Sequence, residues 1–153
     1  MNDQKAALPF SQACENNKVP ILSVIQPLFA KAKTVLEIGS GTGQHAEYFS
    51  QQMPHLTWQC SDRQINLANL ELRLGNHDSG NLPPPIALDL LTSSWPDLSI
   101  DAVFSANAVH IMPWQGVEIL FDAVGKALPV NGQLVLYGPF NYGGKYTSES
   151  NAN

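Results

Sequence analysis

The stretch that decides the fold is T-V-L-E-I-G-S-G-T-G-Q-H, residues 34–45 of this 153-residue chain. It opens on an apolar run of aliphatic residues, the composition of a short buried strand. Glycine then stands at every second position, as Gly39, Gly41 and Gly43, and a helical pattern begins at Gln44. Glycines in such a turn let the backbone adopt positive φ angles and let a ligand approach the amides at the positive end of the helix. The stretch therefore predicts a strand, a glycine turn and a helix that together hold a small cofactor.

Two residues beside the turn distinguish between cofactors. A dinucleotide fingerprint, G-x-G-x-x-G/A, requires Gly or Ala where this chain has Gln44. Glu37, two residues before the first glycine, would repel a pyrophosphate but suits a ligand that carries an ammonium and a sulfonium. These two features favour S-adenosylmethionine over NAD.

The same residues carry a resemblance to a known family. The pattern E-x-G-x-G-x-G after an apolar strand resembles the first motif of class I S-adenosylmethionine-dependent methyltransferases. The runs F-S-Q-A-C-E-N-N-K-V-P-I-L (10–22), V-L-E-I-G-S-G-T-G-Q-H (35–45) and S-E-S-N-A-N (148–153) resemble, more narrowly, the methyltransferase-like 26 family. The expected fold is a three-layer α/β/α sandwich around a Rossmann-like, mostly parallel sheet of order 3-2-1-4-5. The usual last two of seven strands are missing from it.

Composition limits the function classes. The chain has 44% hydrophobic residues and fits one domain that buries roughly two thirds of its unfolded surface. Net charge is −5 and the eight Lys and Arg residues are scattered, so nucleic acid is not expected as a partner. No apolar segment has the length of a signal-peptide core or a membrane span, so we expect a cytoplasmic protein without a membrane partner.

The chain is expected to divide into an N-terminal helical lid segment (1–33), a Rossmann-like core (34–142) and a flexible tail (143–153). Residues 1–18 read as irregular, followed by a helix with Pro20 in its first turn. Pro27 predicts two short helices or a kink, because proline in a helix interior costs roughly 3 kcal/mol.

In the resembled class, a leading segment often folds over the cofactor. Asn17 and Lys18 are then candidate substrate-binding residues. The alternative is that they are solvated residues at the start of a helix.

An acidic residue follows the expected second strand, residues 56–60. Asp62 lies 19 residues after Gly43, where doubly wound folds place a carboxylate that accepts hydrogen bonds from ribose hydroxyls. Alternatively, Asp62 or Ser61 caps the next helix. Arg63 is placed in the same cofactor site, together with Ser40 and His45 of the glycine turn.

A second acid follows the short third strand, residues 86–88. The resemblance implies that Asp89 accepts a hydrogen bond from the adenine amine, with Leu90 beside it. The alternative is that Asp89 opens the following turn.

The expected fourth strand, residues 101–105, leads into A-N-A-V-H. Because ligands bind beyond the carboxyl ends of strands at the switch point of an open sheet, Ser105, Asn107 and His110 should face the reacting centre. His110 is a candidate general base at the methyl-acceptor pocket, against the alternative of a local hydrogen-bonding residue. Asn107 is a candidate cofactor or acceptor contact, against the alternative of a turn residue.

The expected fifth strand, residues 133–137, ends in a polar and aromatic stretch. Tyr137, Phe140, Asn141 and Tyr142 are candidates for a wall around a small organic substrate. Nothing after this stretch predicts two further strands. The chain is therefore expected to be cut short, or the edge at residues 134–137 to be covered by a partner such as a second copy in a homodimer.

The sequence thus predicts an S-adenosylmethionine-dependent methyltransferase with a small-molecule acceptor. The alternatives are a non-catalytic binding or scaffold protein of the same fold and, with less support, a NAD(P)-dependent oxidoreductase. No metal is expected, because the four histidines are not spaced as ligands with carboxylates or thiols.

Overall fold

A computed structural model describes residues 8–75, 80–92, 94–106, 114–138, 141–142 and 145–146, the last two pairs by their backbone alone. Its helices (α, and one 3₁₀ helix, η1) and strands run in this order: α1 (Gln12–Leu28), β1 (Thr34–Ile38), α2 (Gln44–Gln52), β2 (Thr57–Asp62), η1 (Gln64–Asn66), α3 (Leu67–Leu74), β3 (Ile86–Ala87), β4 (Ala102–Ala106), α4 (Trp114–Ala127), β5 (Gln133–Tyr137), β6 (Asn141–Tyr142) and β7 (Lys145–Tyr146).

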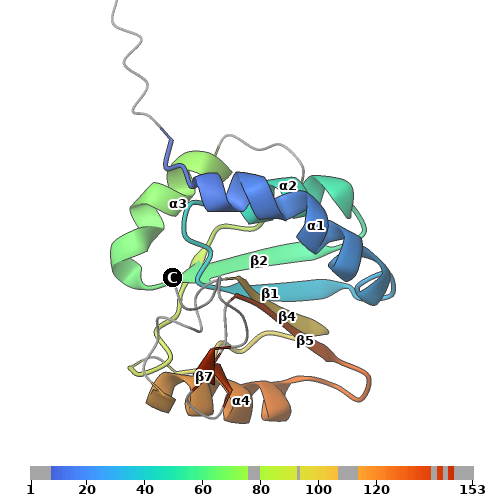
Figure 1. Cartoon of the computed structure of the whole chain (residues 1–153), viewed down its shortest axis with the longest axis vertical. Coiled ribbons are helices and arrows are strands. Elements are labelled where there is room, and N and C mark those ends of the chain that lie inside the picture. Colours follow the sequence, from blue (N-terminus) through green and yellow to red (C-terminus); the bar gives the residue numbers. More distant parts are fainter. Residues whose placement is uncertain are drawn as a thin grey trace, which may run out of the picture.

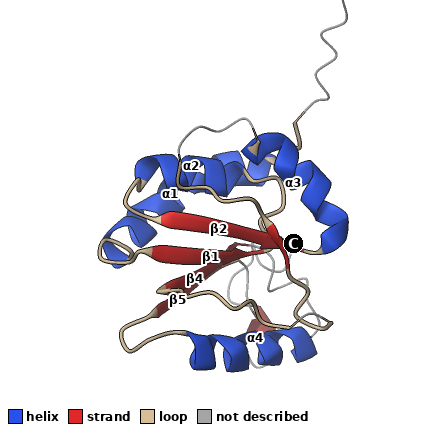
Figure 2. Ribbon diagram, turned by 180° about the vertical axis from the view of Figure 1, so that it is seen from behind, coloured by secondary structure: helices blue, strands red, loops and turns tan. Residues whose placement is uncertain are grey.

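Strands β1 to β5 form one parallel sheet of order β3-β2-β1-β4-β5, which confirms the predicted topology. Helices α1, α2 and α3 cover one face and α4 covers the other, so the fold is the expected three-layer sandwich (Figure 1; Figure 2). The chain moves outward from β1 to β3 and then returns to β4. The switch point of the sheet therefore lies between β1 and β4.

The alternation of side chains along β1 supplies both cores. Leu36 and Ile38 belong to the apolar cluster on the α4 face, whereas Val35 belongs to the cluster beneath α1, α2 and α3. Because side chains two residues apart share a face, Glu37 projects towards α1–α3 with Val35. A carboxylate thus lies beneath helices α1, α2 and α3.

The start of α1 differs from the sequence prediction. The helix begins at Gln12, with Ser11 as its N-cap accepting a hydrogen bond from Cys14 N at 3.3 Å, so the first 18 residues are not all irregular. Pro20 and Pro27 both lie inside this single helix, so the prediction of two short helices is wrong. Burial of the apolar face outweighs the two lost backbone hydrogen bonds, because Ile21, Leu22 and Ile25 pack into the core.

Two smaller expectations about the core and strands are also corrected. The helical spacing of apolar residues over 21–29 and 117–128 predicts Val24, Leu28 and Phe121 on buried faces, but all three side chains are exposed. Strand β2 continues to Asp62, so this acid ends the strand instead of following it.

The last part of the described chain adds a short hairpin. Strands β6 and β7 pair with each other in an antiparallel, two-stranded sheet that does not extend the main one. Strand β5 is the edge strand of the main sheet in the described residues. No helix in the described part of the chain is long and apolar enough to cross a bilayer.

Candidate cofactor site at the glycine turn

The glycine turn adopts the backbone that the sequence predicted. Gly39, Gly41 and Gly43 have φ angles of 71°, 58° and 81°, in the left-handed region that L side chains rarely occupy. A Cβ on Gly43 would lie 3.0 Å from Leu70 Cδ1, so this glycine lets α3 pack against the turn. A Cβ on Gly41 would come no nearer to the described residues than 4.0 Å, from Gly39 O. The Gly41 side of the turn is therefore the open one.

Strand β2 holds the turn in place. Ser40 N donates to Ser61 O at 2.9 Å, and Ser61 N donates back to Ser40 Oγ at 3.1 Å. One residue further along each segment, Gly41 N donates to Asp62 Oδ2 at 2.8 Å. The turn and the end of β2 thus form one rigid unit at the carboxyl edge of the sheet.

Asp62 has a structural role that differs from the helix cap given as its alternative, because the N-caps of η1 and α3 are Arg63 and Asn66. Besides Gly41 N, its carboxylate accepts from Arg63 N at 2.7 Å and from Asn66 Nδ2 at 2.8 Å, both on Oδ1. A carboxylate offers about four lone-pair positions, so about one stays available for a ribose hydroxyl. Asp62 links the turn to η1, and ribose binding stays a prediction. The side chain of Arg63 is exposed.

Glu37 is buried below the turn. Its side chain is only 2% exposed, and Oε1 accepts from Trp58 Nε1 at 3.1 Å and faces Cys60 Sγ at 3.8 Å. Burial raises the pKa of this carboxyl from 4.5 to about 7, and the charge of Asp62 acts in the same direction. At neutral pH the group is therefore close to half ionised. Its predicted contact with the amino-acid end of a cofactor stays a prediction.

The first turn of α1 lies against the first turn of α2 through Gln44. This side chain is 4% exposed, and its Oε1 accepts from Ser11 N and from Thr42 Oγ1. Its Nε2 donates to Ser11 O at 3.2 Å and to Glu15 Oε2 at 2.7 Å. Gln44, which departs from the dinucleotide fingerprint, is thus the residue that holds the start of α1 against α2.

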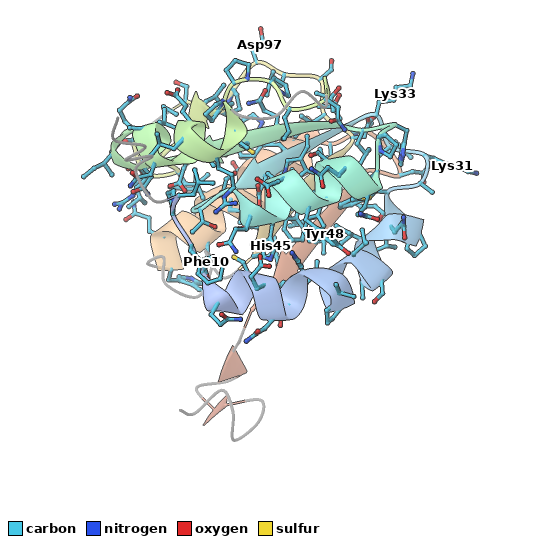
Figure 3. All side chains as sticks on the ribbon, turned by 90° about the horizontal axis from the view of Figure 1, so that it is seen from above. Phe10, Lys31, Lys33, His45, Tyr48 and Asp97 are labelled. Atoms are coloured by element: carbon cyan, nitrogen blue, oxygen red, sulfur yellow. The ribbon has the colours of Figure 1, made fainter. Side chains whose placement is uncertain are left out.

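Asn17 and Lys18 point at α2 from the same helix. Asn17 Oδ1 lies 2.7 Å from His45 Nε2, and Lys18 Nζ lies 2.9 Å from Glu15 Oε1 and 4.9 Å above the Tyr48 ring. Figure 3 shows His45 and Tyr48 in the layer between α2 and α1, with Phe10 just before α1. These contacts give both residues a structural role, and substrate binding by them stays a prediction.

The imidazole of His45 is a neutral group at neutral pH. Burial lowers its pKa from 6.5 to about 4, and the positive charge of Lys18 adds to this, whereas Glu15 opposes it. The ring stacks on Phe49 at 5.2 Å between centroids and meets Phe104 edge-on at 6.2 Å. His45 therefore belongs to the aromatic layer next to Glu37, and a direct cofactor contact is untested.

Arg73 of α3 is the site residue that sequence reasoning missed. Its Nε donates to Thr42 O at 2.9 Å, its Nη1 lies 3.4 Å from Glu47 Oε2, and its Nη2 donates to Pro9 O. The guanidinium thereby joins the glycine turn, α2 and the leading segment. Its place beside Leu70 and Leu74 on the apolar face was the only available signal, because its partners are distant in sequence.

Asp89 lies one strand beyond Asp62 at the same edge of the sheet, since Leu88 N donates to Asp62 O at 2.8 Å. Its Oδ1 accepts from Leu91 N at 3.0 Å and its carbonyl from Thr92 N at 3.1 Å, so it opens a turn. Leu90 is half-buried against the α4-side cluster. The adenine contact of this pair stays a prediction.

The other half of the predicted site is described only in part. Ser105 is buried and donates to Ile38 O at 2.8 Å, so its hydroxyl ties β4 to β1 and does not face an open centre. Tyr137 ends β5 with 42% of its surface exposed. Asn107, His110 and Phe140 lie outside the described residues. The same holds for the side chains of Asn141 and Tyr142, whose backbone forms β6.

Metal binding has no support in the described part of the chain. No group of three or more His, Cys, Asp or Glu residues there is arranged to hold an ion. The groups available at the carboxyl edge of the sheet are the amides of a glycine turn, a buried carboxyl, and acids at the ends of two neighbouring strands.

Comparison with known proteins agrees with this architecture. Residues 8–153 match the family described as "Protein of unknown function (DUF938)". The fold is similar to the S-adenosylmethionine-dependent methyltransferase SibL in its apo form, with a TM-score of 0.75, 20% identity and 92% of this chain covered. It is also similar to an O-methyltransferase family protein from Burkholderia thailandensis, with a TM-score of 0.68, 20% identity and 81% of this chain covered.

A third similar structure is human N-acetylserotonin methyltransferase in complex with SAM, with a TM-score of 0.68, 12% identity and 82% of this chain covered. The chain spans 40%, 38% and 34% of the length of these three proteins, respectively. At such identities the likeness shows a shared class I methyltransferase fold. Membership of the methyltransferase-like 26 family stays a resemblance of sequence.

Proposed function

The chain belongs to the family described as "Protein of unknown function (DUF938)", and from this premise we propose that it is an S-adenosylmethionine-dependent methyltransferase with a small-molecule acceptor. The observation that carries the proposal is the glycine turn at the switch point of the sheet. There the open side of Gly41 stands at the carboxyl edge near the buried carboxyl of Glu37.

The start of α2 disfavours a dinucleotide. A pyrophosphate needs free amides and no negative charge at a helix N-terminus. Here Gln44 N is capped by Thr42 Oγ1 at 3.3 Å, and the Gln44 side chain brings the Glu15 carboxylate to the first turn of α2. The hydrogen bonds from Lys18 and Gln44 lower the pKa of Glu15, so that carboxylate stays charged at neutral pH. A cationic nucleoside fits this charge pattern better than NAD.

The residues divide the work as follows in the proposal. The turn (Gly39, Ser40, Gly41, Gly43) holds the cofactor's central part, and Glu37 pairs with its ammonium. Asp62 and Asp89 bind the ribose and the adenine. The remaining candidate contacts are His45, Arg63, Leu90 and Asn107.

When bound, the cofactor supplies a methyl group activated by its sulfonium. The chain's own contribution is to align the acceptor and to keep water out. A general base is needed only if the acceptor atom carries a proton that must leave, and His110 is the candidate for that step. Asn17, Lys18, Tyr137, Asn141 and Tyr142 are the candidate acceptor contacts.

Three outcomes of one titration distinguish the proposal from its alternatives. Thermal unfolding of the full chain is followed with S-adenosylmethionine, with its demethylated product, and with NAD. Stabilisation by the first two alone supports the methyltransferase. Stabilisation by NAD alone supports an oxidoreductase, and no response to any of them supports a binding or scaffold protein without this cofactor. Incorporation of labelled methyl groups into a metabolite extract then identifies the acceptor.

We also propose that β5 is a homodimer interface. Its residues 134–136 are apolar and half-buried at the edge of the described sheet, and an uncovered edge strand invites pairing. Light scattering of the purified chain tests this directly. The mass of two chains supports the interface, and the mass of one removes it.

A further inference from the structure

We infer that Gln44 and Arg73 are positioning residues that couple docking of the leading segment, residues 9–17, to the glycine turn. This deepens the proposed function and rests on it for the identity of the ligand. Neither residue needs to touch the cofactor, because each acts through the backbone and side chain of Thr42.

Polar contacts hold the start of the leading segment. None of the side chains at residues 9–17 is buried, and the first buried residue of α1 is Ile21. The hydrogen bonds described between this stretch and the rest of the fold beyond α1 come from three side chains, Gln44, His45 and Arg73. Docking of this segment thus depends on a few hydrogen bonds and not on a large apolar area.

Two of these side chains, Gln44 and Arg73, also hold Thr42 of the glycine turn. Gln44 Oε1 accepts from Thr42 Oγ1 at 2.9 Å, and Arg73 Nε donates to Thr42 O at 2.9 Å. Their other polar atoms bond to Ser11 and Pro9. Thr42 lies between Gly41 and Gly43, so release of the leading segment would free the two side chains that hold this residue of the turn.

Docking of the leading segment and binding of the cofactor are linked by thermodynamic reciprocity. If docking of the leading segment raises the affinity for the cofactor by some factor, the cofactor must stabilise docking by the same factor. The coupling is therefore measurable from both sides.

The key variant is Gln44→Glu, which keeps the size of the side chain. It replaces the donor that lies 2.7 Å from Glu15 Oε2 with a second carboxylate, so the two groups repel. Electrostatics alone would make a cationic ligand bind more tightly to this variant, whereas coupling predicts weaker binding. The matched control is Gln51→Glu, the same change at an exposed position of α2.

The rescue variant combines Glu15→Gln with Gln44→Glu. It restores an amide opposite a carboxylate with donor and acceptor exchanged, at the net charge of the original chain. Glu15→Ala, a change at a partly exposed position, is the second single variant and removes one of the acceptors of Gln44 Nε2. It keeps the test decisive should Gln44→Glu fail to fold.

The experiment measures two quantities on the full chain. The first is amide hydrogen exchange at residues 9–17 and 39–43 without ligand, and the second is the calorimetric Kd for S-adenosylmethionine. We expect Gln44→Glu to speed exchange in both segments and to raise Kd at least fivefold. Glu15→Ala should do the same to a smaller extent, the double variant should return to within about twofold of the original, and Gln51→Glu should change neither.

The coupling is wrong if exchange in Gln44→Glu rises at residues 9–17 but not at 39–43, or if Kd stays within twofold. Unchanged exchange in both segments would show that Gln44 holds nothing. If the original chain binds no S-adenosylmethionine, the proposed function fails, and the exchange data alone decide whether the two segments are coupled.

Discussion

The two ends of the sheet differ in kind. At the amino ends of the strands, a groove of about 590 Å³ lies between the α1–β1 and α4–β5 connections, and its charged lining residues are Lys31 and Asp101. Figure 3 places Lys31 and Lys33 at the end of the molecule opposite Phe10. At the carboxyl ends lie the glycine turn, Glu37 and Asp62. The groove and the glycine turn therefore lie at opposite ends of the sheet.

The charged groups of the two ends also differ in what holds them. Asp101 accepts from Lys33 N at 2.8 Å and Thr34 N at 2.9 Å, so it caps the entry to β1. Glu37 and Asp62 are both buried, and burial raises the pKa of the Glu37 carboxyl to about 7. A buried acid with a raised pKa is typical of functional sites, and among the described residues Glu37 lies at the same end of the sheet as the glycine turn.

The largest expected effect comes from Gly41→Val. Valine tolerates a φ of 58° poorly, and its side chain would fill the open side of the turn, so we expect Kd for S-adenosylmethionine to rise at least 100-fold, about 2.7 kcal/mol. The matched variant is Gly132→Ala at the amino end, where the Cβ would lie 2.8 Å from Leu128 Cβ. That variant should lower the melting temperature and leave Kd unchanged. Equal Kd values for both variants would contradict the comparison.

The second effect is the pH dependence of binding through Glu37. With a pKa of about 7, the carboxylate form that pairs with an ammonium falls about eightfold in population between pH 7.5 and pH 6. Kd of the original chain should rise by that factor, measured by calorimetry at both values. The Glu37→Gln variant is the control for titration of the ligand itself. It should bind S-adenosylmethionine weakly, and its Kd should lack the pH dependence that Glu37 adds. A parallel pH dependence in both proteins would remove Glu37 from the site.

Stability gives Glu37 an independent signature. Its folded pKa is raised, so the folded state binds more protons than the unfolded state between pH 4.5 and about 7, and stability falls as pH rises through that window. Glu37→Gln should therefore be more stable than the original chain at pH 8, by up to about 3 kcal/mol, with the difference vanishing near pH 4.5. Urea unfolding at the two pH values measures this, and a difference independent of pH would mean the carboxyl is not buried as described.

A smaller effect is expected from Asp62→Ala. It removes the acceptor of Gly41 N and the predicted ribose contact, so Kd should rise about tenfold, roughly 1.4 kcal/mol. Calorimetry of the purified variant checks this value. An unaltered Kd with lower stability would show that Asp62 only supports the turn.

The smallest effect on binding is expected from Asp101→Ala. Loss of the acceptor for two partly exposed amides should lower stability by about 1 kcal/mol. Because the groove is separate from the cofactor edge, Kd should not change. A change in Kd would mean that the two ends of the sheet communicate.

Much of the fold could be predicted because it depends on local patterns. The glycine turn, the apolar runs and the alternation of strands and helices predict a parallel sheet, because a helix between two strands is the usual connection of parallel neighbours. The continuity of α1 through Pro20 and Pro27 could not be predicted, because proline disfavours a helix interior that burial of Ile21, Leu22 and Ile25 nevertheless stabilises. In this helix, tertiary packing outweighs the low helix propensity of proline.

The sequence indicated which residues belong to the candidate site, but it did not indicate their hydrogen-bond partners. The sequence indicated Glu37 and Asp62, yet their bonds to Trp58 and to Gly41 depend on the register of β1 against β2. Arg73 lies more than 30 positions from Thr42 and more than 60 from Pro9, so no local pattern could reveal that it joins them. Long-range contacts of this kind appear only once the layers are assembled.

The most direct test of the central claim is calorimetric titration of the full chain with S-adenosylmethionine and, separately, with NAD. The account predicts one binding site for the sulfonium nucleoside, lost in Gly41→Val and kept in Gly132→Ala, with no heat from NAD. Binding of NAD alone, or sulfonium binding that survives Gly41→Val unchanged, would contradict the assignment of the glycine turn as the cofactor site.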